Sequence, residues 1–350
     1  MKVIIAIDSF KGCISSEEAN LAAAEGIKNV IPEADIHQVT VSDGGEGFME
    51  AFHSAIGGSW HYTKVCDPLM RPITAKYLQK DKLAVIEMAA ASGLTLLKKE
   101  ERNPMLTTTY GTGQLIADAI KHGTKEIIVG LGGSATSDAG IGMLKALIDS
   151  FTDNGKWDDI NILKNVHFTI ASDVKNPLYG PNGAAQVFAP QKGATPNMVE
   201  QLDSRAKVFA QKSAKHFGYD YSNNEGAGAA GGLGYALMQY LNADCKPGIE
   251  LLLDTIHFDN LTKEADYVIT GEGAADKQTL MGKLPIGILQ HSGKAKCCLI
   301  AGRINDKQQL LQAGFHKVTC INPSDISIEE AMRKDVALQN IQDTVKSIIR

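Results

Sequence analysis

The chain opens on Val3-Ile4-Ile5-Ala6-Ile7, an apolar run that is followed by the loop Asp8-Ser9-Phe10-Lys11-Gly12. Because the run is short and uninterrupted by polar residues, we predict a buried parallel strand there. Ser15-Ser16-Glu17-Glu18 then supplies a hydroxyl cap and acidic residues, which are typical of a helix start, and we predict a helix over about 17–29. A strand, a loop and a helix in this order are the signature of an α/β protein.

Similar strand–loop–helix units recur near the C-terminus, whereas the middle of the chain has a different pattern. The strands expected at the two ends are 3–7, 36–41, 267–270, 297–301 and 317–321. The middle begins with strands joined by short turns, at 61–65, 73–78 and 84–88, and continues with strands at 126–131 and 166–171. We therefore predict a discontinuous parallel α/β domain formed by 1–66 and 262–350, with a mixed α/β domain at 67–261 inserted into it.

Composition excludes several classes of protein. The 350 residues suffice for two domains, and a net charge of −5 argues against a general nucleic-acid binder. The longest uncharged stretch, 226–243, is rich in glycine, so we expect no membrane span. The 6 cysteines show no C-x-x-C spacing, which favours reduced thiols in a cytosolic protein. The composition is compatible with a homo-oligomer.

Carboxylates follow several of the predicted strands, together with glycine. They are Asp8, Asp43, Asp138, Asp173 and Glu272. One such residue is commonly no more than a helix cap. In parallel sheets, however, ligands gather beyond the carboxyl ends of the strands, and so many carboxylate loops together predict a cleft for a metal ion and a polar substrate.

Three glycine-rich segments are candidates for close backbone approach. Gly132–Asp138 combines a strand end, a tight turn and hydroxyl groups, which predicts a phosphate cradle; the alternative is an ordinary turn with a Ser or Thr cap. It is not a Walker A loop. Gly271–Asp276 begins like a dinucleotide fingerprint but lacks the third glycine. Gly226–Gly234 allows a ligand, or simply a neighbouring element, to pack tightly.

Ordered blocks along nearly the whole chain resemble the bacterial glycerate kinases of the type-1 family. These blocks are Asp8–Gly12, Asp43–Gly47, Thr109–Gly113, Gly130–Thr136, Ser172–Val174, Asn176–Leu178, Gly180–Ala185, Pro190–Ala194, Gly228–Gly234, Ile269–Gly273, Asp276, Gln278–Thr279 and Gly282–Lys283. The resemblance implies ATP-dependent phosphorylation of D-glycerate with Mg²⁺, a phosphotransferase reaction with an alcohol acceptor, and favours 2-phosphoglycerate over 3-phosphoglycerate. It also implies a flavodoxin-like domain and an inserted α/β domain with the active site in the cleft between them.

The sequence departs from the family pattern at a few positions. Cys13 replaces the usual Ser, and Phe48 replaces a Thr. Ala274 stands where Arg or Ser is common, a change that would remove a phosphate contact, and Ala275 replaces a larger aliphatic residue. The segment 148–165 is shorter than usual.

The resemblance and the carboxylate loops together define the expected site. We choose Asp173 as the residue that accepts the substrate hydroxyl proton, with Asp43 as its competitor, and either could instead hold Mg²⁺. Lys11 is the third candidate catalytic residue. The expected substrate-binding residues are Asp8, Ser9, Lys11, Arg71, Asn176 and Lys192, of which the three cations would meet the glycerate carboxylate or the phosphates. The expected nucleotide-binding residues are Gly132, Gly133, Ser134, Thr136, Gly271, Glu272 and Gly273. The expected metal ligands are Asp138, Glu272 and Asp276.

Two other classes of function compete with a kinase. An oxidoreductase with a dinucleotide domain would need a complete G-x-G-x-x-G after the first strand, and that motif is missing. A non-catalytic protein that binds a nucleotide or another anion for regulation would need a pocket but not the repeated carboxylate loops.

Overall fold

The computed structural model describes residues 1–42, 44–45, 47–277 and 279–349. The chain forms two compact units. The first comprises Met1–Asp43, Glu50–Ile56 and Ile249–Arg350, and the second comprises Gly44–Met49 and Gly57–Gly248. The first unit is therefore made from both ends of the chain.

The first unit is built on a parallel sheet of β1 (Lys2–Ile7), β2 (Asp35–Gln38), β9 (Tyr267–Ala275), β10 (Lys296–Ile304) and β11 (Lys317–Cys320). The strands lie in the order β11-β10-β9-β1-β2. Counted along the chain within this sheet, that order is 2-1-3-4-5, the flavodoxin-like arrangement. The predicted flavodoxin-like fold is therefore confirmed.

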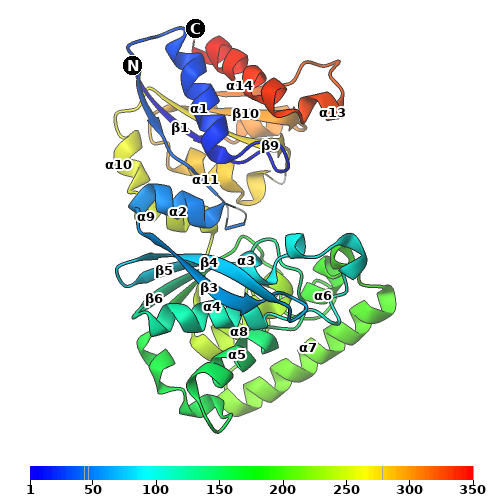
Figure 1. The fold of residues 1–350 in the computed structure, drawn as a ribbon. Helices are drawn as coiled ribbons and strands as arrows, with labels where there is room; N and C mark the ends of the chain where they lie inside the picture. The colour runs from blue at the N-terminus through cyan, green and yellow to red at the C-terminus, as the bar shows by residue number, and fades with distance from the viewer. Residues whose placement is uncertain (43, 46, 278, 350) are drawn as a thin grey trace. The chain divides into compact units, whose positions relative to one another are not determined.

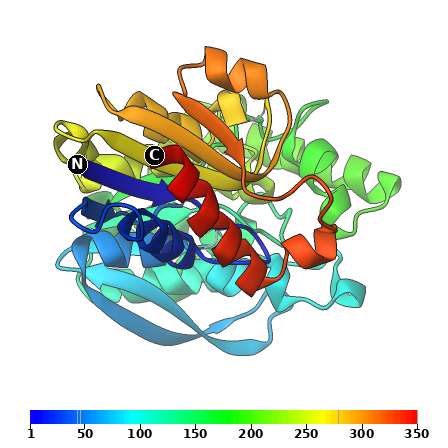
Figure 2. The same cartoon turned by 90° about the horizontal axis from the view of Figure 1, so that it is seen from above.

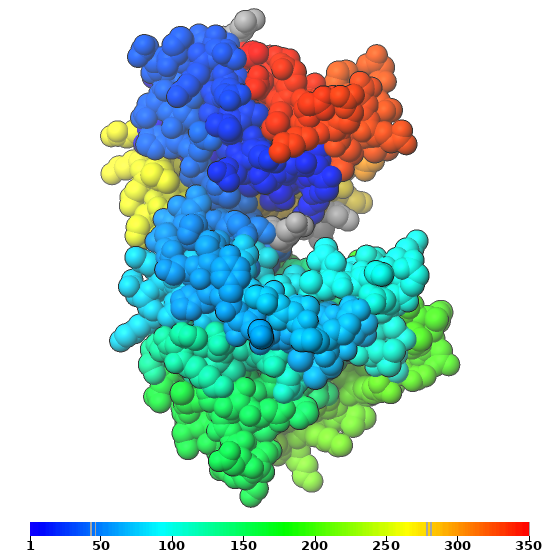
Figure 3. Space-filling view, viewed as in Figure 1, coloured from blue at the N-terminus to red at the C-terminus, as the bar shows by residue number. Residues whose placement is uncertain are grey.

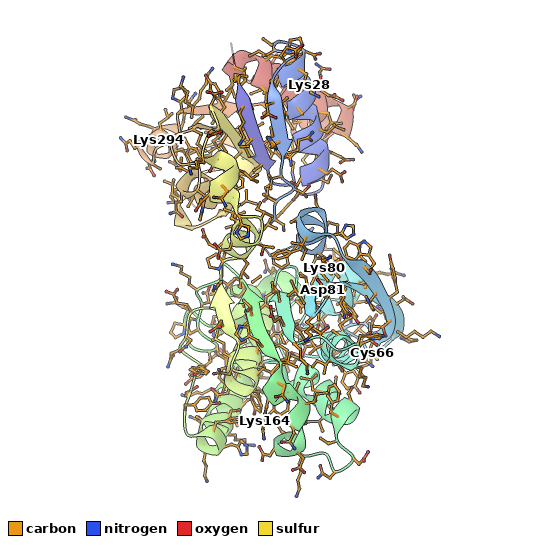
Figure 4. The ribbon with its side chains drawn as sticks, turned by 90° about the vertical axis from the view of Figure 1, so that its left-hand side faces the viewer. Lys28, Cys66, Lys80, Asp81, Lys164 and Lys294 are labelled. Atoms are coloured by element: carbon orange, nitrogen blue, oxygen red, sulfur yellow. The ribbon has the colours of Figure 1, made fainter. Side chains whose placement is uncertain are left out.

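Helices α1 (Ser16–Lys28) and α14 (Lys334–Ile349) pack side by side on one face of this sheet, as Figures 1 and 2 show. Ile5, Ile27 and Ile341 are fully buried between them. Figure 3 shows the N-terminal and C-terminal segments forming one continuous surface of the first unit. Ser15 caps α1, as predicted, with the Glu18 side chain completing a capping box. Lys28 closes the last turn (Figure 4).

Shorter helices complete the first unit: the Glu50–Ile56 part of α2 (Phe48–Ile56), then α9 (Gly248–Thr255), α10 (Phe258–Thr262), α11 (Leu284–Gln290), α12 (Lys307–Gln312) and α13 (Ile328–Ala331). The sequence pattern predicts one helix near 328–349, whereas the structure divides this segment into α13 and α14. Strand β2 ends at Gln38, earlier than predicted, whereas β9 continues to Ala275. Glu272 therefore lies within a strand and not in a loop after one.

The second unit contains a mixed sheet of β3 (Ser59–Cys66), β4 (Pro72–Lys80), β5 (Leu83–Glu87), β6 (Glu126–Gly130), β7 (His167–Ala171) and β8 (Asp244–Lys246). The strands lie in sequence order, antiparallel from β3 to β5 and parallel from β5 to β8. Figure 4 marks Lys80 and Asp81 at the turn between β4 and β5. Since β3 pairs with β4 along its whole length, it belongs to this unit, although 59–66 was expected in the first domain.

The longer helices of the second unit are α4 (Tyr110–Lys121), α5 (Ile141–Phe151), α7 (Pro196–Phe217) and α8 (Ala229–Leu241), with the short α3 (Ala89–Ser92) and α6 (Ala184–Phe188). The sequence pattern predicts a helix over about 112–122 capped by Thr112, but the helix begins at Tyr110, so Thr112 lies inside it. The Thr112 hydroxyl is instead 2.8 Å from the hydroxyl of Ser92. Among the described residues, no helix has the length and apolar character needed to cross a bilayer.

One histidine links three helices of the first unit. His291 follows α11, with Nδ1 2.8 Å from Oδ1 of Asp259 on α10 and Nε2 3.0 Å from Oε2 of Glu250 on α9. Burial lowers the pKa of His291, but the hydrogen bonds and charges of Asp259 and Glu250 outweigh burial, so the pKa is raised. When it is protonated, the His291 imidazole therefore pairs with both carboxylates.

We predict that His291 makes the first unit more stable at low pH than at high pH. The raised pKa lies above the unfolded value of about 6.5, so the contribution is complete below that value and is lost as the pH rises through the folded-state pKa. Its size is about 1 kcal/mol or less, because Asp259 is largely exposed. Urea unfolding of His291→Asn should lack this pH dependence, whereas a matched variant of the exposed His316, His316→Asn, should keep it.

The two units can be followed separately in this test. Both tryptophans, Trp60 and Trp157, lie in the second unit, so their fluorescence reports its unfolding, while circular dichroism reports both units. An equal pH dependence in wild type and His291→Asn would contradict the assignment.

Candidate active site

A pocket of about 690 Å³ opens in the first unit where β1, β9, β10 and β11 end. Strand order reverses between β1 and β9, and ligands of open parallel sheets bind at such a reversal. Five of the residues predicted from the sequence line this pocket: Asp8, Ser9, Lys11, Glu272 and Gly273. The structure thus brings together residues from the two ends of the chain.

The two carboxylates of the pocket come from the strands on either side of the reversal. Asp8 directly follows β1, and its backbone N–H donates to the carbonyl oxygen of Gly271 on β9 at 2.9 Å. Its Oδ1 accepts from the Ser9 N–H at 2.7 Å. Glu272 lies in β9, and both side chains are largely buried, with 8% of each residue exposed. The β1–β9 pairing therefore fixes both carboxylates at one edge of the sheet.

Burial raises the pKa of Glu272, and this effect is opposed by three neighbours. The hydroxyl of Thr279 donates to Oε1 at 2.6 Å, Nζ of Lys283 lies 3.8 Å from Oε2, and the charge of Lys11 acts in the same direction. Asp276, predicted as a metal ligand beside Glu272, is near enough for its charge to raise this pKa further. Glu272 is thus a desolvated carboxylate in a cationic setting.

Sequence reasoning missed two cations and an entire wall of the pocket. The cations are Lys283 and Arg303, and the wall comes from the chain after β11, with Ile321, Pro323, Ile326, Ile328, Ala331 and Met332. Arg303 could have been found, because it follows the apolar run 297–301 just as Asp8 follows 3–7. The wall has no such signal, because its apolar residues lie scattered among polar ones.

In the second unit, the predicted phosphate loop Gly132–Asp138 is tightly packed. A Cβ on Gly132 would lie 2.4 Å from the Cα of Gly45, so only glycine fits there. The N–H of Gly132 donates to the carbonyl oxygen of Gly44 (3.2 Å), that of Ala135 to the carbonyl oxygen of Ser92 (2.9 Å) and that of Thr136 to the hydroxyl of Ser134 (3.1 Å). The N–H groups of Gly132 and Thr136 therefore already have acceptors within the protein, and a phosphate would have to replace them.

Asp138, predicted as a metal ligand, is a helix cap. Its Oδ2 accepts from the N–H and the hydroxyl of Thr109 (2.8 and 2.9 Å), the N–H of Gly142 (3.1 Å) and the hydroxyl of Thr108 (3.3 Å). Its Oδ1 accepts from the N–H of Gly140 at 3.1 Å. The carboxylate thus accepts several hydrogen bonds from the protein, one of them from an N–H group in the first turn of α5.

Lys192, predicted to meet a substrate anion, is 3% exposed and bonds within the protein. Its Nζ donates to the carbonyl oxygen of Thr136 at 2.6 Å and to the hydroxyl of Ser134 at 3.2 Å. Burial lowers the pKa of Lys192 to about 7, against the opposing charge of Asp138. Gly231 packs on the same loop, with a Cβ there 2.0 Å from the Thr136 carbonyl oxygen, so this glycine serves close packing.

The remaining predicted residues of the second unit lie on other loops. Arg71 is held by Asp67, with Nε 2.5 Å from Oδ2, and by Glu101, with Nη1 2.7 Å from Oε1. Asn176 donates from Nδ2 to the carbonyl oxygen of Asn182 at 2.8 Å. Asp173 is half-buried just beyond the end of β7.

The last predictions to compare with the structure are Asp43 and the three metal ligands. Asp43 lies outside the described residues. Across the part of the chain that is described, no three His, Cys, Asp or Glu side chains gather as a metal-binding group. The predicted trio Asp138, Glu272 and Asp276 is therefore not such a group.

Comparison with known proteins gives one consistent result. The sequence profile of the Glycerate kinase family matches residues 3–159 and 156–350. The glycerate kinase of Bacillus subtilis (strain 168) is 41% identical, with 99% of this chain and 97% of the relative covered. The glycerate 2-kinase of Escherichia coli (strain K12) is 39% identical, over 95% and 93%.

A solved structure agrees with these relatives. A crystal structure described as that of a glycerate kinase 2 from Salmonella typhimurium LT2 superposes with a TM-score of 0.82 at 35% identity, covering 99% of this chain and 97% of the other. The chain therefore belongs to the glycerate kinase family.

Proposed function

We propose that this kinase transfers the γ-phosphoryl group of ATP to D-glycerate and forms 2-phosphoglycerate. Family membership supports a phosphotransferase with an alcohol acceptor. The observation that carries the proposal is the pocket at the β1–β9 strand reversal, where Lys11, Lys283 and Arg303 surround two largely buried carboxylates. Phosphoryl transfer requires such a concentration of cations and carboxylates, since the protein's task is to position the phosphates and neutralise their charge.

Within this pocket, Lys11 and Lys283 are the proposed partners of the phosphates. Lys283 is already oriented by Glu272, whose Oε2 lies 3.8 Å from its Nζ, and Lys11 acts on the same carboxylate. A lysine serves phosphate as a point charge. Both cations thus lie close enough to Glu272 for their charges to act on it.

Asp8 and Glu272 fit the needs of Mg²⁺. This ion is usually held by one or two protein carboxylates together with phosphate oxygens and water. Burial disfavours the charged form of Glu272, and a bound cation would restore it. Mg²⁺ held there with the nucleotide would neutralise negative charge on the phosphates. Asp138 has no such capacity, because donors already surround it.

In the second unit, Asp173 is the proposed base for the glycerate hydroxyl. It stands just beyond the carboxyl end of β7, beside the parallel strand β6, and is half-buried. A half-buried carboxylate at a strand end can accept a proton from a hydroxyl brought within hydrogen-bond reach, about 2.6–3.2 Å. Asp43 remains the competing candidate for this role.

We predict that phosphorylation requires both ATP and Mg²⁺ and that the phosphate is placed on the secondary hydroxyl. The ³¹P NMR signal of the product should be split by one carbon-bound proton, as expected for 2-phosphoglycerate, and not by two. Exhaustive chelation should abolish turnover, and added Mg²⁺ should restore it. Equal rates with and without chelation would sink the metal proposal, and a triplet would assign the primary hydroxyl.

We predict that Glu272→Gln reduces turnover at least tenfold without unfolding the protein. A neutral amide removes the charge that orients Lys11 and Lys283, yet its burial costs less than that of a carboxylate. Asp138→Asn should keep wild-type turnover but lose about 1–3 kcal/mol of stability. The reason is that the amide group of the new side chain would face the N–H donors of α5. Steady-state kinetics and thermal unfolding of both variants make the comparison. A Glu272→Gln enzyme of wild-type kcat would remove this residue from the site.

We predict that Asp173→Asn lowers kcat by about 10²–10⁴-fold while ATP and glycerate affinity change little. If Asp173 only holds its turn, the Asn side chain can still accept a hydrogen bond and the variant should be nearly silent. The exposed Asp153 on the same unit offers the matched control Asp153→Asn. Retention of more than about a tenth of wild-type kcat would refute the assignment, and a larger loss in Asp43→Asn alone would move the role to Asp43.

A further inference from the structure

We infer that the apolar wall of the first-unit pocket binds the base of the nucleotide and that Arg303 binds its phosphates. This inference rests on the proposed use of ATP and adds where each part of the nucleotide lies. Nothing in the sequence patterns singled out either feature. We define the apolar wall as Ile321, Pro323, Ile326, Ile328, Ala331 and Met332.

The pocket has two chemically distinct sides. One carries Asp8, Lys11, Glu272 and Lys283, and the other is the apolar wall. Its volume of about 690 Å³ lies within the range of about 300–1,000 Å³ for small-molecule sites. A nucleoside triphosphate has the same division, with a flat, largely apolar ring at one end and a row of anions at the other. The two ends of such a ligand match the two sides of the pocket.

Two residues of the apolar wall are exposed, although a folded chain would normally bury such side chains. Ile328 is 81% exposed and Met332 44% exposed, although both line a concave surface. Exposed apolar residues grouped in a pocket commonly mark a ligand site. Met332 is also well suited to a flat ring, because its thioether is polarisable and its side chain adapts in shape.

Met332 also joins the wall to the cationic side of the pocket. A Cβ placed on Gly12 would lie 3.5 Å from the Cε of Met332, so the wall meets the loop that carries Lys11. If the base of the nucleotide lay on Met332, its phosphates would therefore lie near Lys11. The base and the phosphates would then contact neighbouring parts of the pocket, as the two ends of one ligand must.

Arg303 is the cation best placed for a new partner. It lies on β10 in register with Ala274 of β9, it is exposed, and both residues line the pocket. Within the described residues, its side chain makes no hydrogen bond or ion pair, in contrast to Lys283, which pairs with Glu272. A guanidinium binds phosphate oxygens in a bidentate manner, which makes arginine well suited to this task.

The experiment is calorimetric titration of ATP and of inorganic tripolyphosphate, which has the anions but no ring, into wild type and variants. Arg303→Ala should weaken both ligands about tenfold. Met332→Ser and Ile328→Ser should each weaken ATP about tenfold and leave tripolyphosphate unchanged. Matched controls in the same unit, Leu311→Ser and Lys307→Ala, alter exposed residues that do not line the pocket and should match wild type.

The outcomes separate this inference from the proposed function. If wild type binds ATP and phosphorylates glycerate but the Arg303, Met332 and Ile328 variants bind both ligands as wild type does, the inference is overturned and the proposed function stands. If wild type binds no ATP, both fail. If Met332→Ser weakens ATP and tripolyphosphate equally, the wall does not bind the base.

Discussion

The parallel pairing of β1 with β9 is the constraint on which the site depends. It joins residues from opposite ends of the chain, with Ile7 in register with Gly271, so that Asp8 and Glu272 emerge next to each other. Without this pairing, Asp8 in the loop after β1 would not lie beside Glu272, and the two carboxylates could not share one ligand site.

Electrostatics then gives the pocket its chemistry. Glu272 has been taken out of water, which disfavours its charge, and Lys11 and Lys283 restore part of what burial removes. When phosphates and a divalent cation bind together, the interactions among these oppositely charged groups would change. The half-buried Asp138 and the buried Lys192 of the second unit show the contrasting case, in which the hydrogen-bond partners of ionisable groups are supplied by the fold itself.

The sequence predicted much of this arrangement, and its failures have physical reasons. Asp8, Ser9 and Lys11, which were predicted to bind substrate, line one pocket, because a short apolar run shows where a buried strand ends. In Gly132–Asp138, which was predicted to be a phosphate cradle, the N–H groups of Gly132 and Thr136 have acceptors within the protein, and sequence does not show such acceptors. No local pattern reveals that Lys192, which was predicted to meet a substrate anion, is only 3% exposed. The apolar wall could not be predicted, because its residues follow β11 without the regular hydrophobic spacing of a helix or a strand.

The most direct test is a crystal structure with Mg²⁺ and a non-hydrolysable ATP analogue. We expect electron density for the triphosphate beside Lys11, Glu272 and Arg303, with the adenine ring against Met332. Density for the triphosphate at the Gly132–Asp138 loop, with the first-unit pocket empty, would show that the β1–β9 strand reversal does not form the nucleotide site.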